Sequence, residues 1–356
     1  MKILITGICG FVGSTIAKNW LQSQTGLTIY GLDNFIRPGS EGNRQTLKKL
    51  GVKLYHGDIR FPSDLESLPQ VDWVIDAAAN PSVLAGIDGR TNSRQLVEHN
   101  LFGTVNILEY CKRHGAGFIL LSTSRVYSID SLAKVVVEPV NEAFRLSREQ
   151  QFPIGLTPDG VNENFSTVSP ISLYGSTKLS SEIMAIEYGK TFDLPVWINR
   201  CGVLAGAGQF GRVDQGIAAY WINMYLHRRP LTYIGFGGKG YQARDFLHPA
   251  DLVPLLQKQT KAPSFEGDKV FNIGGGCSHT FSLAELSRWC ANRFGNHSVS
   301  GDIQERRFDI PWLVMDSANA RKTFDWHPQT TLHAILEEIA LHAEAYPDWL
   351  ELSGNL

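Results

Sequence analysis

Short apolar runs alternate with longer stretches of helical periodicity through the first half of the chain. Several of the apolar runs are nearly continuous, which is typical of strands in a parallel sheet that is covered on both faces. They predict strands at residues 2–6, 27–33, 53–57, 73–77, 117–122 and 196–200. Between them, the pattern predicts helices at 11–24, 91–114 and 169–192. This alternation predicts right-handed βαβ units and therefore an α/β fold with a doubly wound parallel sheet.

The pattern changes at two places. Residues 128–168 are polar and contain three prolines, so we interpret them as a long insertion over one edge of the sheet. After residue 202 the chain is rich in glycine and aromatic residues, and helices are expected at 216–228, 282–294 and 332–344. The sequence therefore predicts a larger domain over residues 1–200 and a smaller C-terminal α/β lobe over 201–356, with some chain crossing between them.

Composition and charge exclude several classes of protein. Lys and Arg total 33 against 35 Asp and Glu, which gives a formal charge of −2, so the chain lacks the basic excess of a general nucleic-acid or membrane-surface binder. No apolar run approaches the roughly 20 residues of a membrane span, and the first residues do not resemble a secretory signal. Five scattered cysteines and ten histidines show no disulfide or metal-ligand spacing, which favours a cytoplasmic protein without a metal.

A glycine-rich turn follows the first predicted strand and opens the first predicted helix. Its glycines allow a tight turn, close approach of a pyrophosphate and close packing of helix on strand. The helix N-terminus then offers unpaired N–H groups and a partial positive charge to phosphates. The turn therefore predicts a Rossmann fold whose dinucleotide lies against Gly7, Gly10, Phe11, Val12 and Gly13.

An acidic residue favours one of the two nicotinamide cofactors. Asp33 stands 20 positions beyond Gly13, at the end of the second predicted strand, where a carboxylate accepts the adenosine ribose hydroxyls and repels a 2′-phosphate. NAD is therefore favoured over NADP, although Arg37 nearby keeps NADP open. The other candidate cofactor contacts follow later strands of the same sheet or lie on the next helix, and they are Asn34, Asp58, Ile59, Ala77, Ala78, Ala79 and Asn100.

Tyr174 and Lys178 lie four residues apart in a predicted helix, and therefore they share one of its faces next to the cofactor. The Lys178 ammonium and the positive nicotinamide favour phenolate, so we expect the pKa of Tyr174 to fall below its ordinary value of about 10. Such a phenol can act as the general base that deprotonates a sugar alcohol. A hydroxyl at the end of the fifth predicted strand would hold the sugar oxygen, and the residues themselves leave open whether it is Ser122, Thr123 or Ser124.

These features together resemble one enzyme family, the extended short-chain dehydrogenase/reductases, also called the NAD-dependent epimerase/dehydratase family. The resemblance covers nearly the whole chain. It is carried by the glycine turn, Asp33, the hydroxyl run before Val126-Tyr127, the Tyr174/Lys178 pair and residues 244–248. In this family the catalytic hydroxyl stands four positions before the tyrosine of the Val-Tyr pair, which implies Thr123.

The two residues after Thr123 indicate which reactions of the family the resemblance implies. Dehydratases of this family carry Asp-Glu there to move protons during water loss, whereas this chain has Ser124-Arg125. Arginine does not give up a proton near neutral pH. The resemblance therefore implies epimerisation or net reduction at one carbon, and it argues against dehydration.

Within the family, the long insertion and the stretches 174–178 and 209–216 are most similar to enzymes that epimerise CDP-linked sugars at C2. This similarity implies a CDP-linked 3,6-dideoxyhexose as substrate, a transient 2-keto sugar, and return of the same hydride from NAD that stays bound. Arg244 and Arg306 would bind the pyrophosphate, and Arg307 can exchange roles with Arg306. The other implied substrate contacts are Thr123, Ser124, Asn199, Gln209, Asp214 and Gln215; Asp214 is equally suited to cap the following helix.

Several alternatives stay open. UDP- or GDP-sugar 4-epimerases and sugar reductases of this family share the catalytic residues, and a non-catalytic NAD-sensing scaffold would keep the fold. Ser128 and the run Asn80-Pro81-Ser82-Val83 depart from the family pattern near the expected sugar pocket, which leaves the identity of the sugar open. The helices at 96–109 and 179–188 carry apolar faces where this family dimerises, which implies a homodimer or homotetramer.

Overall fold

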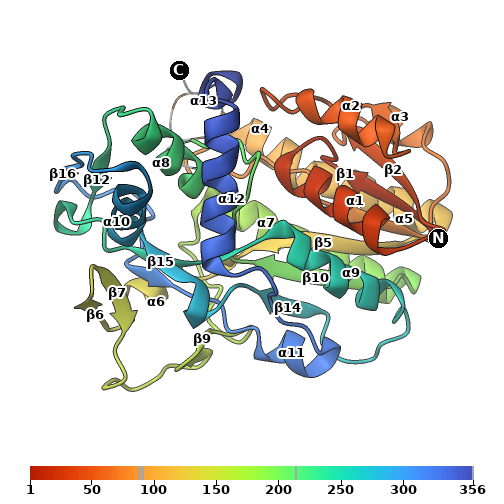
Figure 1. The fold of residues 1–356 in the computed structure, drawn as a ribbon. Helices are drawn as coiled ribbons and strands as arrows, with labels where there is room; N and C mark the ends of the chain where they lie inside the picture. The colour runs from red at the N-terminus through yellow and green to blue at the C-terminus, as the bar shows by residue number, and fades with distance from the viewer. Residues whose placement is uncertain (87–88, 90–91, 213–214, 355–356) are drawn as a thin grey trace.

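The computed structural model describes residues 1–86, 89, 92–212 and 215–354, and its largest feature is a seven-stranded parallel sheet (Figure 1). The strand order is β14-β10-β5-β4-β1-β2-β3. This order confirms the predicted doubly wound sheet, because the chain winds outward from β1 in both directions. The strands are β1 (Lys2–Thr6), β2 (Thr28–Asp33), β3 (Lys53–His56), β4 (Trp73–Asp76), β5 (Gly117–Thr123), β10 (Val196–Cys201) and β14 (Val270–Ile273).

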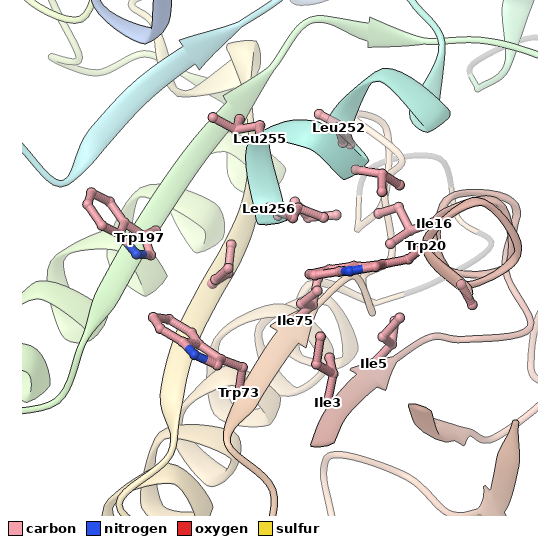
Figure 2. Packing of buried hydrophobic residues seen from close by; sticks show 14 of the residues in the cluster. Ile3, Ile5, Ile16, Trp20, Trp73, Ile75, Trp197, Leu252, Leu255 and Leu256 are labelled. Atoms are coloured by element: carbon pink, nitrogen blue, oxygen red, sulfur yellow. The ribbon is translucent and has the colours of Figure 1, made fainter. Parts of the chain in front are cut away.

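Helices cover both faces of this sheet because its strands are apolar on both faces. On one face, Ile5, Trp20 and Leu255 belong to one buried cluster, part of which Figure 2 shows. On the other face, Leu4 packs in a cluster with Ile107. The first face carries α1 (Phe11–Ser23), α2 (Gly42–Lys49), α9 (Leu252–Thr260) and α11 (Ala318–Phe324), and the second carries α3 (Pro62–Glu66), α5 (Gly103–His114) and α7 (Ser172–Phe192).

The predicted strands are all present with bounds within one residue of those expected, but two elements differ. The helix expected at 91–114 is divided into α4 (Ser93–Val97), a π-helical turn η1 (Glu98–Phe102) and α5. The edge strand β14 was not predicted, because its run Val-Phe-Asn-Ile is short and is followed by three glycines. It joins the main sheet from beyond residue 200, as do α9 and α11.

The insertion at 128–168 is folded; residues 161–163 lie at the β14 edge, and β7 (Ala143–Leu146) contacts β13 (Ala243–Leu247), β15 (Thr280–Ser282) and β17 (Trp312–Leu313) of the C-terminal part. Its elements are α6 (Ile129–Ala133), β6 (Val137–Val140), β7 (Ala143–Leu146), β8 (Leu156–Thr157) and β9 (Gly160–Val161). The amide of Asn272 in β14 donates to Glu163 Oε1 at 2.7 Å, and the Asn272 side chain donates to the Val161 carbonyl at 2.7 Å. These bonds occupy polar groups that an edge strand would otherwise leave open.

The C-terminal part is a smaller layer of strands and helices beside the sheet's carboxyl edge. In Figure 1, α12 (Leu332–Ala345) runs down the middle of the molecule, between the main sheet and this part. Its strands are β11 (Val203–Leu204), β12 (Thr232–Ile234), β13 (Ala243–Leu247), β15 (Thr280–Ser282), β16 (Ser300–Asp302) and β17 (Trp312–Leu313). Its helices are α8 (Ile217–Leu226), α10 (Leu283–Phe294), α12 (Leu332–Ala345) and α13 (Trp349–Leu352). The short 3₁₀ turns are η2 (Ser124–Val126), η3 (Phe236–Gly238), η4 (Pro249–Asp251) and η5 (Cys277–His279).

Among the described residues, no helix combines the length and the apolar character that crossing a bilayer requires.

Candidate active site

The glycine turn forms a bare backbone cradle at the N-terminus of α1. Gly7 has φ +61°, and a Cβ placed on it would lie 3.0 Å from the Ala78 Cα. A Cβ on Gly13 would overlap the Gly7 carbonyl, so α1 packs directly on the turn. The chain just after β4 completes the cradle, because the Ala78 amide donates to Thr6 Oγ1 at 3.2 Å. An open backbone at a helix N-terminus suits a diphosphate, so these residues fit a dinucleotide.

Asp33 lies at the other end of this cradle and is hydrogen-bonded to its backbone. Its carboxylate accepts the Cys9 amide at 2.8 Å and the Phe35 amide at 2.8 Å. Burial raises the pKa of Asp33, and these amide hydrogen bonds oppose that rise. Arg37, which had kept NADP open, donates to Gln215 Oε1 at 3.0 Å and to the Phe210 carbonyl at 2.7 Å. Its guanidinium is thus hydrogen-bonded to Phe210 and Gln215, which favours NAD.

Two other candidate cofactor residues are held by protein partners. Asp58 accepts hydrogen bonds from Asn34 at 2.8 Å and from Arg60 at 2.7 Å. Burial alone would raise the pKa of Asp58, but the bonds from Arg60 and Asn34 lower it to about 2. The contact of Asp58 with the adenine stays a prediction, as do the cofactor contacts of Asn34, Ile59, Phe11, Val12 and Ala79.

Asn100 lies in the π-helical turn and is buried. Its side chain accepts the Asn80 amide at 2.8 Å and donates to the Asn80 carbonyl at 3.0 Å and to Thr177 Oγ1 at 3.2 Å. These bonds hold the loop after β4 against α7, and the contact of Asn100 with the cofactor stays a prediction.

Thr123 and Tyr174 meet at the carboxyl end of β5. The Thr123 hydroxyl accepts the Arg125 amide at 3.2 Å and is hydrogen-bonded to the Tyr174 phenol. A Cβ on Gly175 would overlap the Arg125 carbonyl, so α7 lies directly on the η2 backbone. This close packing brings the phenol to the threonine.

The pKa of Tyr174 differs from the predicted one. Burial raises its pKa to about 12, while the bond to Thr123 and the positive charge of Arg125 lower it. The expected fall below 10 is therefore wrong for the chain alone, because burial outweighs the nearby charges. Lys178 is also buried, and burial lowers its pKa while the negative charges of Asp76 and Glu182 raise it.

A buried polar network under the site separates the three candidate hydroxyls. Ser122 donates to Glu182, which forms an ion pair with Arg200 at 2.7 Å. Arg200 donates to the Tyr127 hydroxyl at 3.3 Å. Ser122 is thus engaged beneath α7, whereas Thr123 reaches Tyr174. The network was not predicted, because its members come from β5, α7, β10 and the residue after η2, and no local motif joins them.

A small cavity lies beside Ser124, next to the Thr123–Tyr174 pair. Its volume is about 10 Å³, room for one small group. Most of its lining is apolar, and the residues are Val83, Ser124, Arg125, Tyr127, Ile129, Leu132, Ile171, Ser172, Phe308 and Ile310.

Arg125 lines this cavity, and Arg244 lies near Arg125. Arg125 donates to the Phe308 carbonyl at 3.3 Å, and Arg244 donates to the Ile310 carbonyl at 2.7 Å and pairs with Asp309 at 3.3 Å. Burial, and then the positive charge of Arg125, lower the pKa of Arg244 to about 10. Two guanidinium groups with one directly paired carboxylate favour an anionic ligand. Arg125 was not among the predicted contacts, because sequence alone does not show the 308–310 segment beside it.

The other predicted substrate residues have mixed positions. Asn199 is fully buried on the α9 side, where its amide exchanges hydrogen bonds with Gln259 at 2.9 and 2.8 Å; its expected sugar contact is wrong, since β10 points it away from α7. Gln209 donates to the Leu204 carbonyl at 2.7 Å. Arg306 is exposed, and so is Arg307. Asp214 lies outside the described residues.

A buried phenol bonded to a hydroxyl, beside a dinucleotide cradle, defines a class of NAD-dependent enzymes that exchange a hydride with an alcohol carbon. Within that class, the chain belongs to the NAD dependent epimerase/dehydratase family, whose model matches residues 3–274. The chain is accordingly an enzyme, and NAD is its cofactor.

Individual relatives cover almost the full length. The chain is 28% identical over 346 residues to the CDP-paratose 2-epimerase of Salmonella typhi, across 93% of this chain and 96% of that protein. It is 30% identical over 362 residues to an uncharacterised UDP-glucose epimerase of Bacillus subtilis, across 97% and 99%. The crystal structure of UDP-glucuronic acid 4-epimerase from Bacillus cereus, in complex with UDP-glucuronic acid and NAD, matches with a TM-score of 0.76 and 26% identity across 97% of this chain and 99% of that chain.

Proposed function

We propose that the protein is a CDP-3,6-dideoxyhexose 2-epimerase that interconverts CDP-paratose and CDP-tyvelose. Similarity to the Salmonella typhi enzyme over nearly the whole chain supports this reaction. The observation that carries the chemistry is the hydrogen-bonded Thr123–Tyr174 pair with Arg125 beside it.

The first half of the reaction removes a hydride from C2 and the proton from its hydroxyl. Tyr174 accepts that proton, while Thr123 holds the sugar oxygen. NAD supplies the hydride acceptor at this step and the hydride donor at the next. The resulting 2-keto sugar presents its other face, and Tyr174 returns the proton to the oxygen as the C–H bond re-forms. Atoms and electrons balance with no net consumption of cofactor.

Epimerisation fits the residues at the cavity better than dehydration does. Loss of water from the sugar needs groups that give and take protons at two further carbons. None of the ten described residues that line the cavity is a carboxylic acid. Arg125 takes the place where dehydratases of the family have one, and a guanidinium stays charged.

The lining of the cavity supports a deoxy sugar. Val83, Ile171 and Phe308 face the small space beside Ser124. An apolar wall of this size suits a methyl or methylene group, whereas a hydroxyl or hydroxymethyl group there would lose hydrogen bonds to water. A 3,6-dideoxyhexose carries both apolar groups.

A UDP-sugar 4-epimerase is the second candidate. The likeness to the Bacillus cereus enzyme, whose complex contains UDP-glucuronic acid, favours it. So do the two neighbouring arginines, since Arg125 and Arg244 together suit a sugar carboxylate as well as a pyrophosphate.

The experiment compares the two substrates with the same enzyme. We expect CDP-paratose to be inverted at C2, followed by NMR in D₂O, with no deuterium entering C2, because the same hydride returns. UDP-glucuronate should be left unchanged. Tyr174→Phe should keep bound NAD and lose inversion by at least a thousand-fold, within the range for loss of a general base.

Two results would contradict the proposal. Inversion of UDP-glucuronate at C4 without action on CDP-paratose would establish the second candidate. Deuterium at C2 would show that a proton, and not a hydride, leaves that carbon.

A further inference from the structure

Residues 206–212, between β11 and α8, cross from the phosphate end of the cofactor cradle toward its ribose end. At the first end, a Cβ placed on Gly206 would lie 3.3 Å from Phe11 Cζ. Phe11 is the first residue of α1, whose N-terminus faces the glycine turn. This end of the segment therefore lies over the place where the turn would hold a diphosphate.

At the other end, the segment is fastened to the connection that follows Asp33. Arg37 donates to the Phe210 carbonyl at 2.7 Å, and its guanidinium lies 5.7 Å from the centre of the Phe210 ring. Gly39 has φ +87°, and a Cβ there would lie 3.0 Å from Phe210 Cε1. Because Arg37 comes four residues after Asp33, Phe210 lies beside the ribose end of the cradle.

The C-terminal helix α13 supports the same segment. Trp349 Nε1 donates to the Gln209 carbonyl at 2.8 Å, and the Trp349 and Phe210 rings stack at 5.4 Å with an angle of 17°. Arg212 donates to the Ser353 carbonyl at 3.4 Å. Phe210 is 5% exposed as a result, although it belongs to a connection between elements.

We propose that residues 206–212 form a strap over the ADP half of NAD, fastened by Arg37 on the cofactor side and by Trp349 on the other. Arg37 is then a positioning residue: it holds the strap, and the strap slows release of the cofactor. The inference rests on the proposed function only in that return of the same hydride requires NAD to stay bound. Release of NAD is measured without any sugar, so an error in the sugar leaves this result unaffected.

The test measures how fast bound NAD leaves the full-length enzyme when excess ADP-ribose is added. We expect Arg37→Met to release NAD ten- to a hundred-fold faster, because it removes hydrogen bonds from a charged donor. Arg37→Lys should restore part of the retention. Arg44→Met is the matched control, since Arg44 is an exposed arginine on the next helix, over the Phe35 ring, and it should leave the rate unchanged.

Trp349→Phe separates a strap from a direct contact of Arg37 with the cofactor. It keeps an aromatic ring against Phe210 and removes only the donor to Gln209, so the fold should be retained. A strap predicts faster NAD release in this variant also, by about three- to ten-fold. Faster release in Arg37→Met with an unchanged rate in Trp349→Phe would overturn the strap, as would an unchanged rate in Arg37→Met.

Discussion

At the scale of single residues, the phenol of Tyr174 is held protonated by burial and prepared for ionisation by two neighbours. Burial raises its pKa to about 12, and Thr123 and Arg125 act in the opposite direction. The Cys201 thiol, when ionised, also raises the pKa of Tyr174. The phenolate is the active form of a general base, so every positive charge near Tyr174 increases the active fraction at neutral pH. Arg125 is the nearby cation that the chain itself supplies.

The role of Arg125 predicts a shift in the pH dependence of the first half-reaction. Below the pKa of Tyr174, the rate of NAD reduction after mixing with substrate should rise with pH, because the phenolate fraction rises. Arg125→Met removes a charge that lowers this pKa, so the rise should move to higher pH by roughly one unit. Arg125→Lys should move it back. Stopped-flow absorbance of NADH between pH 6 and 10 measures the profile, and coincident profiles for wild type and Arg125→Met would contradict it.

Single residues were predictable where a local motif fixes them. The glycine turn and Asp33 could be recognised because strand, turn, helix and acid follow one another along the chain. Tyr174 and Lys178 followed from helical spacing, but the pKa of Tyr174 did not, because burial depends on the whole fold. Asn199 was misassigned because a strand end gives the position along the sheet and not the face on which a side chain lies.

At the scale of elements, the sequence pattern located the main strands and missed irregular geometry. The helix expected at 91–114 contains a π-helical turn at Glu98–Phe102. This turn places Asn100 against the Asn80 backbone. The extra residue of this turn appears in the sequence as one apolar spacing of five, from Leu96 to Leu101, and a single irregular spacing does not by itself identify a π-helical turn. The insertion could be recognised by its polarity. Its contacts with β14 could not be predicted, because that strand lies about 100 residues further along the chain.

The hydrogen bond between Glu163 and β14 predicts a specific loss of stability on mutation. Glu163 Oε1 accepts the Asn272 amide at 2.7 Å, and Glu163→Ala would leave a largely buried donor without its partner. We expect the free energy of unfolding to fall by about 1–3 kcal/mol. Glu163→Gln keeps an acceptor oxygen and should cost less. Glu149→Ala, at an exposed position of the same insertion, is the control for denaturant unfolding, and a loss no larger for Glu163→Ala than for Glu149→Ala would disprove the contact's importance.

At the scale of the whole molecule, the site exists because distant segments meet at one edge of the sheet. The carboxyl ends of β1, β2, β4 and β5 supply the cradle and Thr123, and the C-terminal part supplies Arg244 and the 308–310 segment. The strand order, and the carboxyl edge as the place of the site, could be predicted from the βαβ alternation. The return of the chain to the main sheet through β14, α9 and α11 could not be predicted in this detail, since these elements lie beyond the residue-200 boundary expected for the first domain.

The outer surface of η1 and α7 predicts how two copies associate. Phe102 is 55% exposed and Ile183 is 54% exposed. Two flanking contacts, Ser181 to the Asn100 carbonyl at 3.0 Å and Tyr188 to Glu109 at 2.6 Å, show that η1–α5 and α7 run side by side in the same direction. The two apolar side chains therefore lie at similar heights on one surface, where a second copy can bury both.

We expect the wild type to sediment as a dimer or tetramer at micromolar concentration and the double variant Phe102→Glu/Ile183→Glu to sediment as a monomer. Each glutamate would have to lose its hydration in the interface, at a cost of several kcal/mol. Ile154→Glu is the control, because Ile154 is 85% exposed but lies in the insertion, away from this surface. If the double variant kept the wild-type mass, association would have to use another face. Bound NAD in the variant should then be compared with that in the wild type, because η1 also positions the loop after β4 through Asn100.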